Sequence, residues 1–470
     1  MKQMIFKFWT PYPSGHLCNA ISQLLTPNFY NNKMKILDEP RYVCALGAMQ
    51  SVQAINRAIP VIHAGPGCAG KLAGTIAGTT GDSGYLNPQT YPCTNIGETE
   101  IVFGGEDRLR EVITNSLKVM DGDLFVVLSG CTTEIVGDDI DRVVSEFANA
   151  EKPIISVSTP GFKGTNIQGH EWVINSLINQ YLTRKPQGDT IKGLVNIWGP
   201  VPSYDPYWLG NIRELENLVS ELGLTPNSIF GEFRGIENVD KVPQAEFNLL
   251  VSPWVGLENM QLLQEKFGTP FLHYPTLPIG AHETSAFLRA VSDFAGLDRN
   301  HVEALVEKHE KEYYYYLERS VDIFFENRTA SKMFTTVTTA ANALAVSKFL
   351  INDLGLMPNK QFITEGVPEE HQERVAGYFK DFSYGIEADV VFSADGYDVH
   401  RQIEEEDFAG APLIIGSIFE KKLAHKLDGN FLCISVPIKE KVILHSTYAG
   451  YHGGLKLMED IFTNVYQSFN

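Results

Sequence analysis

The sequence predicts an α/β fold made of three Rossmann-like domains with mainly parallel sheets. Short, nearly continuous apolar runs alternate along the chain with amphipathic helical stretches. That alternation is typical of parallel strands covered by helices on both faces. The length of 470 residues also exceeds one typical hydrophobic core, and a prior of about 150 residues per domain gives about three domains.

Domain limits follow from shifts in composition along the chain. Residues 1–40 are rich in proline, asparagine and aromatic residues, so we expect an irregular N-terminal arm. The polar stretch Arg184–Thr190 separates a first α/β domain, 41–187, from a middle α/β domain, 188–329. A third α/β domain is expected over residues 330–470.

The first domain begins with a helical pattern from Ala48, and three apolar runs then end at turns that contain glycine. Ligands of parallel sheets sit beyond the carboxyl ends of the strands, so we expect functional residues in these turns. The predicted strands are Ala58–His63, Asp123–Ser129 and Pro153–Ser158, and the predicted helices are Arg108–Leu117 and Ile140–Phe147.

The middle and C-terminal domains repeat the alternation. The long helix of the middle domain carries four consecutive tyrosines, Tyr313 to Tyr316, which a helix turns to every side. We therefore predict that they mostly pack against the protein and do not bind a cofactor. The predicted strands are Gly193–Trp198, Asn248–Ser252, Gln361–Thr364, Val390–Ser393 and Leu413–Ile415, and the predicted helices are Asn211–Leu222, Arg299–Phe325 and Ala340–Leu354.

Composition and charge exclude several classes of function. The chain has 38 Lys and Arg against 57 Asp and Glu, a net charge of −19, whereas nucleic-acid binding needs a basic face. No run approaches the roughly 18 apolar residues of a membrane span, and the N-terminus lacks the apolar core of a signal peptide. Six cysteines in so long a chain do not form a disulfide framework. We expect a cytoplasmic protein that binds neither nucleic acid nor membrane.

Three cysteines, Cys44, Cys68 and Cys131, lie in small-residue settings with glycine nearby, and the last two follow predicted strands. Thiolates select iron–sulfur clusters, zinc or copper(I), and clusters prefer four of them, so three from one chain are an incomplete set. Glycine lets the backbone approach a bulky cluster and donate N–H groups to its sulfurs. The alternative interpretation is three buried structural cysteines.

Two other patterns are weaker. Gly65–Leu72 nearly matches the phosphate loop GxxxxGK[ST], but Leu72 replaces the Ser or Thr that would bind magnesium, so we do not predict nucleotide binding there. Glu134, Asp138 and Asp139 could be general acids or metal ligands. Acidic residues also favour helix N-termini, and we interpret these three as a charged helix start.

The order of several motifs resembles component 1 of the nitrogenase family. Its most specific part is the signature Cys-x-x-Glu-x-x-Gly-Asp-Asp at residues 131–139. The resemblance follows the β-subunit pattern and covers nearly the whole chain after about residue 40. The motifs that carry it are Cys44, Gly65–Cys68, Val102–Gly105, Gly130–Asp139, Thr159–Phe162, Leu277–Gly280, Ile434–Pro437 and Tyr448–Gly454.

This resemblance implies that Cys44, Cys68 and Cys131 are the β-side ligands of a P-cluster-type [8Fe-7S] iron–sulfur cluster. In the family, that cluster lies at the subunit interface, and an α-like subunit supplies the remaining thiolates and carries the active-site cofactor. The expected assembly is α2β2, with or without a small extra subunit.

The resemblance also implies a docking residue and a reaction. Phe103 matches the phenylalanine at the surface where a homodimeric, ATP-hydrolysing iron protein docks, although an ordinary core phenylalanine is the alternative interpretation. The chain would be an oxidoreductase subunit that relays electrons and has no catalytic residue of its own. The enzyme would reduce N2 or, if it is nitrogenase-like, another small substrate such as a methylthio-alkane.

The sequence matches an α-like subunit less well than a β-like one. The α-like chains of the family hold the cofactor through one cysteine in the middle domain and one histidine near the C-terminus. Here Cys433 is the only cysteine after Cys131, and His452 has no partner thiol, so we predict a β-like chain. Gly161 departs from the family pattern, in which a serine that binds the oxidised cluster commonly follows Thr-Pro. Ligand exchange on oxidation is therefore not implied.

Two alternatives stay open. One is the β-like subunit of a cofactor-assembly scaffold, although retention of all three cysteines favours the enzyme. The other is a cluster-free α/β binding module. Of the remaining cysteines, Cys18 has no assigned role, and Cys93 is interpreted as a buried structural thiol.

Overall fold

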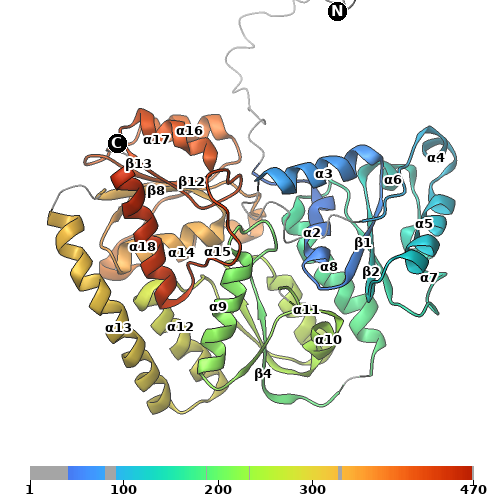
Figure 1. Ribbon diagram of the computed structural model, residues 1–470, viewed down its shortest axis with the longest axis horizontal. Coiled ribbons are helices and arrows are strands. Elements are labelled where there is room, and N and C mark those ends of the chain that lie inside the picture. Colours follow the sequence, from blue (N-terminus) through green and yellow to red (C-terminus); the bar gives the residue numbers. More distant parts are fainter. Residues whose placement is uncertain (1–40, 80–90, 187, 232, 327–330, 468–470) are drawn as a thin grey trace, which may run out of the picture.

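The computed structural model describes residues 41–79, 91–186, 188–231, 233–326 and 331–467. Three sheets follow one another along this part of the chain, and the strand pairings in each are parallel. The predicted α/β fold with mainly parallel sheets is therefore confirmed (Figure 1). The predicted N-terminal arm and Cys18 lie outside the described residues.

The first unit contains a sheet with the strand order β1-β2-β3. Its strands are β1 (Ala58–His63), β2 (Leu124–Ser129) and β3 (Ile154–Ser158). Its α-helices are α2 (Met49–Gln53), α3 (Pro66–Thr79), α4 (Glu98–Phe103), α5 (Glu106–Val119), α6 (Cys131–Val136), α7 (Ile140–Ser145) and α8 (Asn166–Ser176). Short 3-10 or π helices, marked η, are η2 (Ala45–Ala48), η3 (Leu177–Tyr181) and η4 (Leu182–Arg184).

The first sheet is covered by helices on both faces, which explains its continuous apolar strands. Alternate side chains of β2 point to opposite faces. Phe125 and Val127 pack with residues of α5 and α7 in an outer cluster, whereas Val126 and Leu128 join the large central core. Both sets are buried, so β2 shows no polar alternation.

The middle unit contains a sheet with the order β5-β4-β6-β7. Its strands are β4 (Ile191–Trp198), β5 (Thr225–Asn227), β6 (Ala245–Val251) and β7 (Phe271–Tyr274). Its helices are α9 (Trp208–Glu221), α10 (Ile236–Lys241), η5 (Val242–Gln244), α11 (Leu257–Phe267), α12 (Gly280–Ala295) and α13 (Arg299–Glu326).

The C-terminal unit contains a sheet with the order β11-β10-β8-β12-β13, and β9 pairs with the first two residues of β8. Its strands are β8 (Met333–Thr338), β9 (Met357–Pro358), β10 (Gln361–Ile363), β11 (Val390–Phe392), β12 (Leu413–Gly416) and β13 (Asn430–Cys433). Its helices are α14 (Ala340–Asn352), α15 (Glu369–Tyr378), η6 (Ser383–Gly385), α16 (Gly396–Glu404), η7 (Ile418–Glu420), α17 (Lys421–Lys426) and α18 (Gly450–Gln467).

One large apolar core is shared by the three units. It includes Leu128 of β2, Leu249 of β6 and Ile415 of β12, all fully buried. Helix α18 extends this sharing, because it packs against α12 and α13 of the middle unit (Figure 1). Smaller clusters lie outside the first sheet, under α5 and α7, and outside the third sheet, under α16 and α17. Only the inner faces of the units therefore merge.

Most elements lie where the sequence predicts them. β1 has the predicted limits, and β2, β3 and α14 differ from prediction by one or two residues at an end. Each predicted domain range contains one sheet, while the domain limits themselves stay a prediction. Strands β5, β7, β8, β9 and β13 are not predicted by the sequence. No helix in the described part of the chain is long and apolar enough to cross a membrane.

The tyrosines of α13 depart from their prediction. Tyr313 is buried, as packing requires, and its ring contacts Tyr451 of α18. The next three, Tyr314, Tyr315 and Tyr316, are 42%, 51% and 49% exposed. Because consecutive positions on a helix point in different directions, only one of the four can face the α18 side.

A buried ion pair ties the first described residues to the C-terminal unit. The guanidinium of Arg41 donates to Glu420 Oε2 at 3.1 Å and to the hydroxyl of Ser417 at 3.3 Å. His400 Nε2 lies 3.0 Å from the other carboxylate oxygen, Oε1. Burial alone would raise the pKa of Glu420, but the charge of Arg41 and hydrogen bonds from its neighbours lower it to about 2. The carboxylate is therefore ionised in the folded protein.

Replacing Glu420 by glutamine should lower the free energy of unfolding at pH 7 by about 3 kcal/mol, because the buried guanidinium of Arg41 loses a hydrogen-bonded carboxylate partner. The pKa is depressed in the folded state, so the stabilisation is present above pH 4.5 and is lost as the pH falls from 4.5 to about 2. Urea unfolding at several pH values measures both effects.

Glu405→Gln is the matched control, because Glu405 pairs with Arg401 at the surface of the same unit. Its effect should stay below about 1 kcal/mol. Equal losses in the two variants, or a Glu420→Gln loss that does not shrink on acidification, would contradict the role of the buried pair.

Candidate metal centre

Cys68 and Cys131 follow strands that end at the same edge of the first sheet. The register pairs His63, the last residue of β1, with Ser129, the last residue of β2. Gly130 then leads directly to Cys131 at the start of α6, and Cys68 lies in the first turn of α3. Because neighbouring parallel strands end together, both thiols leave the sheet at its carboxyl edge.

Cys44 reaches this edge from a separate segment. It precedes η2 and forms an isolated antiparallel bridge with Thr165. Two backbone hydrogen bonds flank the bridge: Ala45 N–H donates to the carbonyl of Gly164 at 3.1 Å, and Asn166 N–H donates to the carbonyl of Val43 at 3.0 Å. The segment around Cys44 is thereby fixed beside the chain that follows β3.

Gly161 is the residue around which Cys44 and Cys131 pack. A Cβ atom at position 161 would lie 2.7 Å from Cys44 Cβ and 3.5 Å from the Sγ atoms of both cysteines. Real Cβ atoms do not approach so closely, so any side chain there would displace Cys44. Gly161 N–H also donates to Cys131 Sγ at 3.1 Å. The glycine thus brings two sulfurs to one backbone segment and gives one of them a donor.

The three thiols are accessible. Cys44 and Cys68 are exposed and Cys131 is partly exposed, although free cysteine is usually among the most buried residues. The interpretation as three buried structural cysteines is therefore wrong. Partial burial raises the pKa of Cys68, and the nearby thiols of Cys44, Cys131 and Cys93 add to the increase. The four sulfurs therefore share one small region.

Within the described ranges, no three His, Cys, Asp or Glu side chains converge closely enough to hold a single metal ion. Exposed thiols that lie near one another without converging on one point are instead suited to a larger group that takes further ligands from another chain. Three features of the site fit an iron–sulfur cluster: the close contact at Gly161, the N–H group that donates to Cys131 Sγ, and the accessible sulfurs. Binding of such a cluster by Cys44, Cys68 and Cys131 stays a prediction.

The other two described cysteines are held within the fold. Cys93 is partly buried, its Sγ lies 3.5 Å from the carbonyl oxygen of Ala64, and it accepts Asn95 N–H at 3.4 Å. Cys433 is buried at the end of β13. Burial raises the pKa of both thiols. Cys93 is less buried than a purely structural thiol is expected to be.

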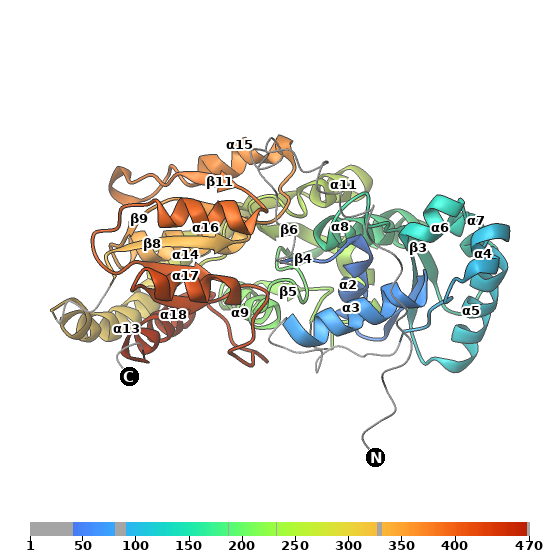
Figure 2. The ribbon, with the colours of Figure 1, turned by 90° about the horizontal axis from the view of Figure 1, so that it is seen from above.

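Phe103 lies on a helix whose apolar side chains face solvent. The exposed fractions of Ile101, Val102 and Phe103 on α4 are 48%, 71% and 85%, and that of Ile135 on the neighbouring α6 is 75%. Figure 2 shows α4 at the outer end of the first unit, remote from the other two units. The interpretation of Phe103 as a core residue is therefore wrong. Exposed apolar residues gathered in this way are typical of a protein-binding surface.

The acidic residues of the signature do not share one role. Asp139 is the N-cap of α7, where its carboxylate accepts Arg142 N–H at 2.9 Å, as the helix-start interpretation predicts. Glu134 lies in the first turn of α6, where its carboxylate accepts the hydroxyl of Ser129 and lies 3.5 Å from Lys163 Nζ. The helix-start interpretation therefore holds for Glu134 and Asp139 but does not describe Asp138.

Asp138 has a partner that the sequence does not reveal. One carboxylate oxygen accepts Gly105 N–H at 2.8 Å, and the other lies 3.0 Å from Nε2 of His63. The second ring nitrogen of His63 lies 3.2 Å from the hydroxyl of Thr94. Burial lowers the pKa of His63, although Asp138 opposes the shift. Since 75 residues separate the pair in sequence, no local pattern could have indicated it.

The segment that resembles a phosphate loop is helical. α3 begins at Pro66, so Gly67 to Leu72 form its first turns. A phosphate loop needs an open turn whose N–H groups surround the anion before the helix starts. The structure therefore agrees with the prediction that no nucleotide binds here.

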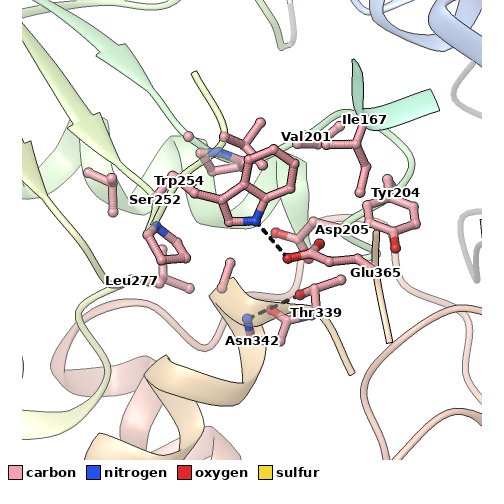
Figure 3. Close-up of a pocket in the computed structure, with 16 residues that line it drawn as sticks. Ile167, Val201, Tyr204, Asp205, Ser252, Trp254, Leu277, Thr339, Asn342 and Glu365 are labelled. Atoms are coloured by element: carbon pink, nitrogen blue, oxygen red, sulfur yellow. Dashed lines mark hydrogen bonds between the residues drawn. The ribbon is translucent and has the colours of Figure 1, made fainter. Parts of the chain in front are cut away.

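A separate pocket lies at the carboxyl ends of strands from the middle and C-terminal sheets (Figure 3). Trp254 Nε1 and Ala340 N–H both donate to Glu365 Oε1 at 2.9 Å. Burial raises the pKa of Glu365 to about 7, although these donors oppose it. None of the described lining residues is a cysteine or histidine. The lining residues are Ile167, Gly199, Pro200, Val201, Tyr204, Asp205, Val251, Ser252, Pro253, Trp254, Val255, Leu277, Thr339, Ala341, Asn342 and Glu365.

His452 lies elsewhere, exposed near the start of α18. Its electrostatic partner is Glu214 of α9. It does not line the pocket, and among the residues that the structure describes no thiol pairs with His452 to hold a cofactor.

The comparisons with known proteins agree on one family. The model of the family described as nitrogenase component 1 type oxidoreductase matches residues 44–466. The nitrogenase molybdenum-iron protein beta chain of Clostridium pasteurianum is 23% identical over 94% of this chain and 95% of the relative. One chain of the light-independent protochlorophyllide reductase of Staurastrum punctulatum is 24% identical over 78% of this chain and 71% of the relative.

Two further similarities concern an alpha chain and a solved structure. The nitrogenase molybdenum-iron protein alpha chain of Methanothermobacter thermautotrophicus is 24% identical over 90% of this chain and 87% of the relative. The structure titled "Nitrogenase Cp1 at pH 6.5" superposes with a TM-score of 0.76 and 20% identity, over 92% of this chain and 93% of that chain. At this identity the structural likeness concerns the fold.

Because Gly161 packs closely against Cys44, adding one carbon atom at position 161 should lower the stability of the chain. Gly161→Ala should lower the free energy of unfolding by about 2 kcal/mol, because the new Cβ overlaps Cys44 Cβ and the packed segment must shift. Denaturant unfolding of the purified chain measures the change.

Gly377→Ala in α15 is the matched control, because a Cβ there meets nothing within 4 Å. It should be neutral or stabilise the chain by up to about 1 kcal/mol. If Gly161→Ala were as stable as Gly377→Ala, the close packing of Cys44 on Gly161 would not exist in solution.

Proposed function

The chain is a β-like member of the nitrogenase component 1 family of oxidoreductases, and we propose that it supplies the β side of a P-cluster-type [8Fe-7S] site. Electrons would come from a homodimeric, ATP-hydrolysing iron protein and pass to a cofactor in an α-like subunit. The observation that carries this proposal is the grouping of Cys44, Cys68 and Cys131 at one sheet edge, with sulfurs that stay accessible.

The chain's own residues would prepare the site. When bound, an iron–sulfur cluster supplies one-electron redox chemistry. Gly161 N–H donates to Cys131 Sγ, and such a donor stabilises negative charge on a ligand sulfur and so raises the reduction potential. Cys44 and Cys68 are exposed, which leaves room for thiolates from the α-like subunit. Three ligands from one chain then become a complete set only in the assembly.

Two observations support the β side of the enzyme over the α side. The chain has no cysteine between Cys131 and Cys433, so the middle unit lacks the thiol by which α-like chains hold their cofactor. The pocket between the middle and C-terminal sheets is lined by neither cysteine nor histidine among the described residues. Trp254 and Glu365 are hydrogen-bonded to each other within it. We therefore propose that the cofactor is carried by the partner.

The exposed side chains of α4 support a docking role for Phe103. A residue that is 85% exposed and apolar gains about 2 kcal/mol or more when a partner buries it. The first turn of α4 carries Glu98 and Glu100, so a docking protein with a basic rim would be favoured. We propose that the iron protein binds this end of the first unit.

The substrate is proposed as N2 or another small molecule reduced by a nitrogenase-like enzyme, such as a methylthio-alkane. The relatives include both nitrogenase chains and a protochlorophyllide reductase chain, so the family supports more than one substrate. The assembly-scaffold alternative is not favoured, because these relatives are all named as chains of a nitrogenase or of a reductase.

Removing a cluster thiol should remove iron. In the anaerobically purified complex with the α-like subunit, Cys68→Ala and Cys131→Ala should sharply lower iron and acid-labile sulfide per αβ pair, because each deletes one proposed ligand. The P-cluster-type EPR signals should disappear with the iron. Elemental analysis and EPR spectroscopy of the same preparations measure both quantities.

Cys433→Ala is the control, since this thiol is buried in another unit. It should keep its iron content even if it lowers stability. Unchanged iron in Cys68→Ala and Cys131→Ala would show that these thiols are not ligands, and the relay proposal would be wrong.

Shortening Phe103 should weaken docking. Phe103→Ala should reduce affinity for the iron protein by about 2 kcal/mol, or about 30-fold, because an exposed aromatic anchor is lost. Cluster content should not change, since Phe103 lies outside the sheet edge that carries the cysteines. Titration of the complex with labelled iron protein measures the affinity.

Phe233→Ala is the matched control, because Phe233 is 84% exposed but belongs to the middle unit. It should leave the affinity within about twofold of wild type. Equal weakening by both variants, or none by Phe103→Ala, would exclude α4 as the docking element.

A further inference from the structure

A buried carboxylate connects the exposed helix α4 with the cysteine-bearing edge of the first sheet. Asp138 lies between α6 and α7, and its side chain is 4% exposed. One oxygen accepts the backbone N–H of Gly105 at 2.8 Å, and the other lies 3.0 Å from Nε2 of His63, whose side chain is fully buried. Neither bond is local in sequence, so the carboxylate joins three segments of the chain.

On one side, Asp138 is coupled closely to α4. Gly105 follows the C-cap of this helix, two residues after Phe103. A Cβ atom at position 105 would lie 2.7 Å from Asp138 Oδ2 and 3.1 Å from His63 Cε1. The corner after α4 therefore has no free space against Asp138. A displacement of α4 must either move the carboxylate or break its hydrogen bond.

On the other side, His63 is coupled to the turn that carries Cys131. Its carbonyl oxygen accepts Gly130 N–H at 2.9 Å and the hydroxyl of Thr133 at 2.9 Å. Gly130 immediately precedes Cys131, and a Cβ there would lie 2.6 Å from Ala64 Cβ. His63 also ends β1, five residues before Cys68. Both proposed ligand segments thus depend on the position of one histidine.

Such a buried, charged link is not the simplest way to stabilise this corner. Desolvating a carboxylate is costly, and apolar side chains of similar volume often stabilise a buried position equally well. What a hydrogen-bonded pair adds is direction, because it fixes the distance and angle between the segments that it joins. The pair therefore holds Gly105 and the end of β1 at a defined separation.

We propose that Asp138 and His63 are positioning residues. When a partner protein docks on α4, they convey the movement of this helix to the segment 129–137. This inference rests on the proposed function. Neither side chain makes a hydrogen bond to a cysteine sulfur in the described part of the chain. They act by holding Gly105 and Gly130 at fixed positions relative to each other.

Hydrogen exchange of the complete complex, with and without saturating iron protein, tests this link. In wild type, docking should slow exchange in α4 and also change exchange in segment 129–137 by about fivefold or more, the lower end of typical coupling between sites. Asp138→Ala should keep the effect in α4 and abolish most of the effect in segment 129–137. Alanine has no polar side-chain atom, so neither Gly105 N–H nor His63 Nε2 keeps its partner.

Asp139→Asn is the matched control. It removes the same charge from the adjacent residue, which is exposed and caps α7, and asparagine caps helices as well as aspartate does. It should retain the full response. His63→Gln keeps an N–H donor near Asp138 and should retain most of it, whereas His63→Leu should lose it. His63→Leu also serves if Asp138→Ala does not fold.

The possible results separate this inference from the proposed function. Loss of the response in Asp138→Ala and His63→Leu, but not in the two conservative variants, supports the link. The same response in Asp138→Ala as in wild type, or docking without any response in wild-type segment 129–137, would overturn it while leaving the docking proposal intact. If saturating iron protein protected nothing in wild-type α4, both the docking proposal and the link would be wrong.

Discussion

The common register of three parallel strands is the constraint on which the candidate site depends. His63, Ser129 and Ser158 are paired at the ends of β1, β2 and β3. The chain therefore leaves the sheet three times at one edge, and these exits lead to Cys68, Cys131 and Gly161. Hydrogen bonding in the sheet makes this arrangement insensitive to the detailed shape of each turn. Accessible thiols are thus positioned by buried backbone.

Much of the fold could be predicted because its cause is local. β1 and β2 are nearly pure apolar runs of six residues between turn residues, and burial on both faces of a parallel sheet requires such runs. The cysteines could be singled out for a related reason, since glycine next to a thiol is visible in the sequence. Their accessibility could not, because it depends on how the segment of Cys44 is held by Thr165.

The elements that the sequence does not predict are governed by long-range partners. β8 is the central strand of its sheet, yet Thr335, Thr336 and Thr338 make half of it polar, and all three are buried. The amide oxygen of Gln361 accepts from Thr336, which a period-two pattern cannot anticipate. The link between His63 and Asp138 has the same origin. A hydrophobic pattern in the sequence indicates which residues prefer burial. It does not indicate which buried polar groups form hydrogen bonds with one another.

The core shared by the three units has a consequence for how the chain can be built and varied. Because Leu128, Leu249 and Ile415 belong to one continuous apolar body, a separate unit would expose the face it normally gives to its neighbours. Isolated fragments would therefore aggregate, and one unit could not be exchanged for a foreign one without matching that face. The chain contains three sheets, but its shared core makes it a single unit for folding and for engineering.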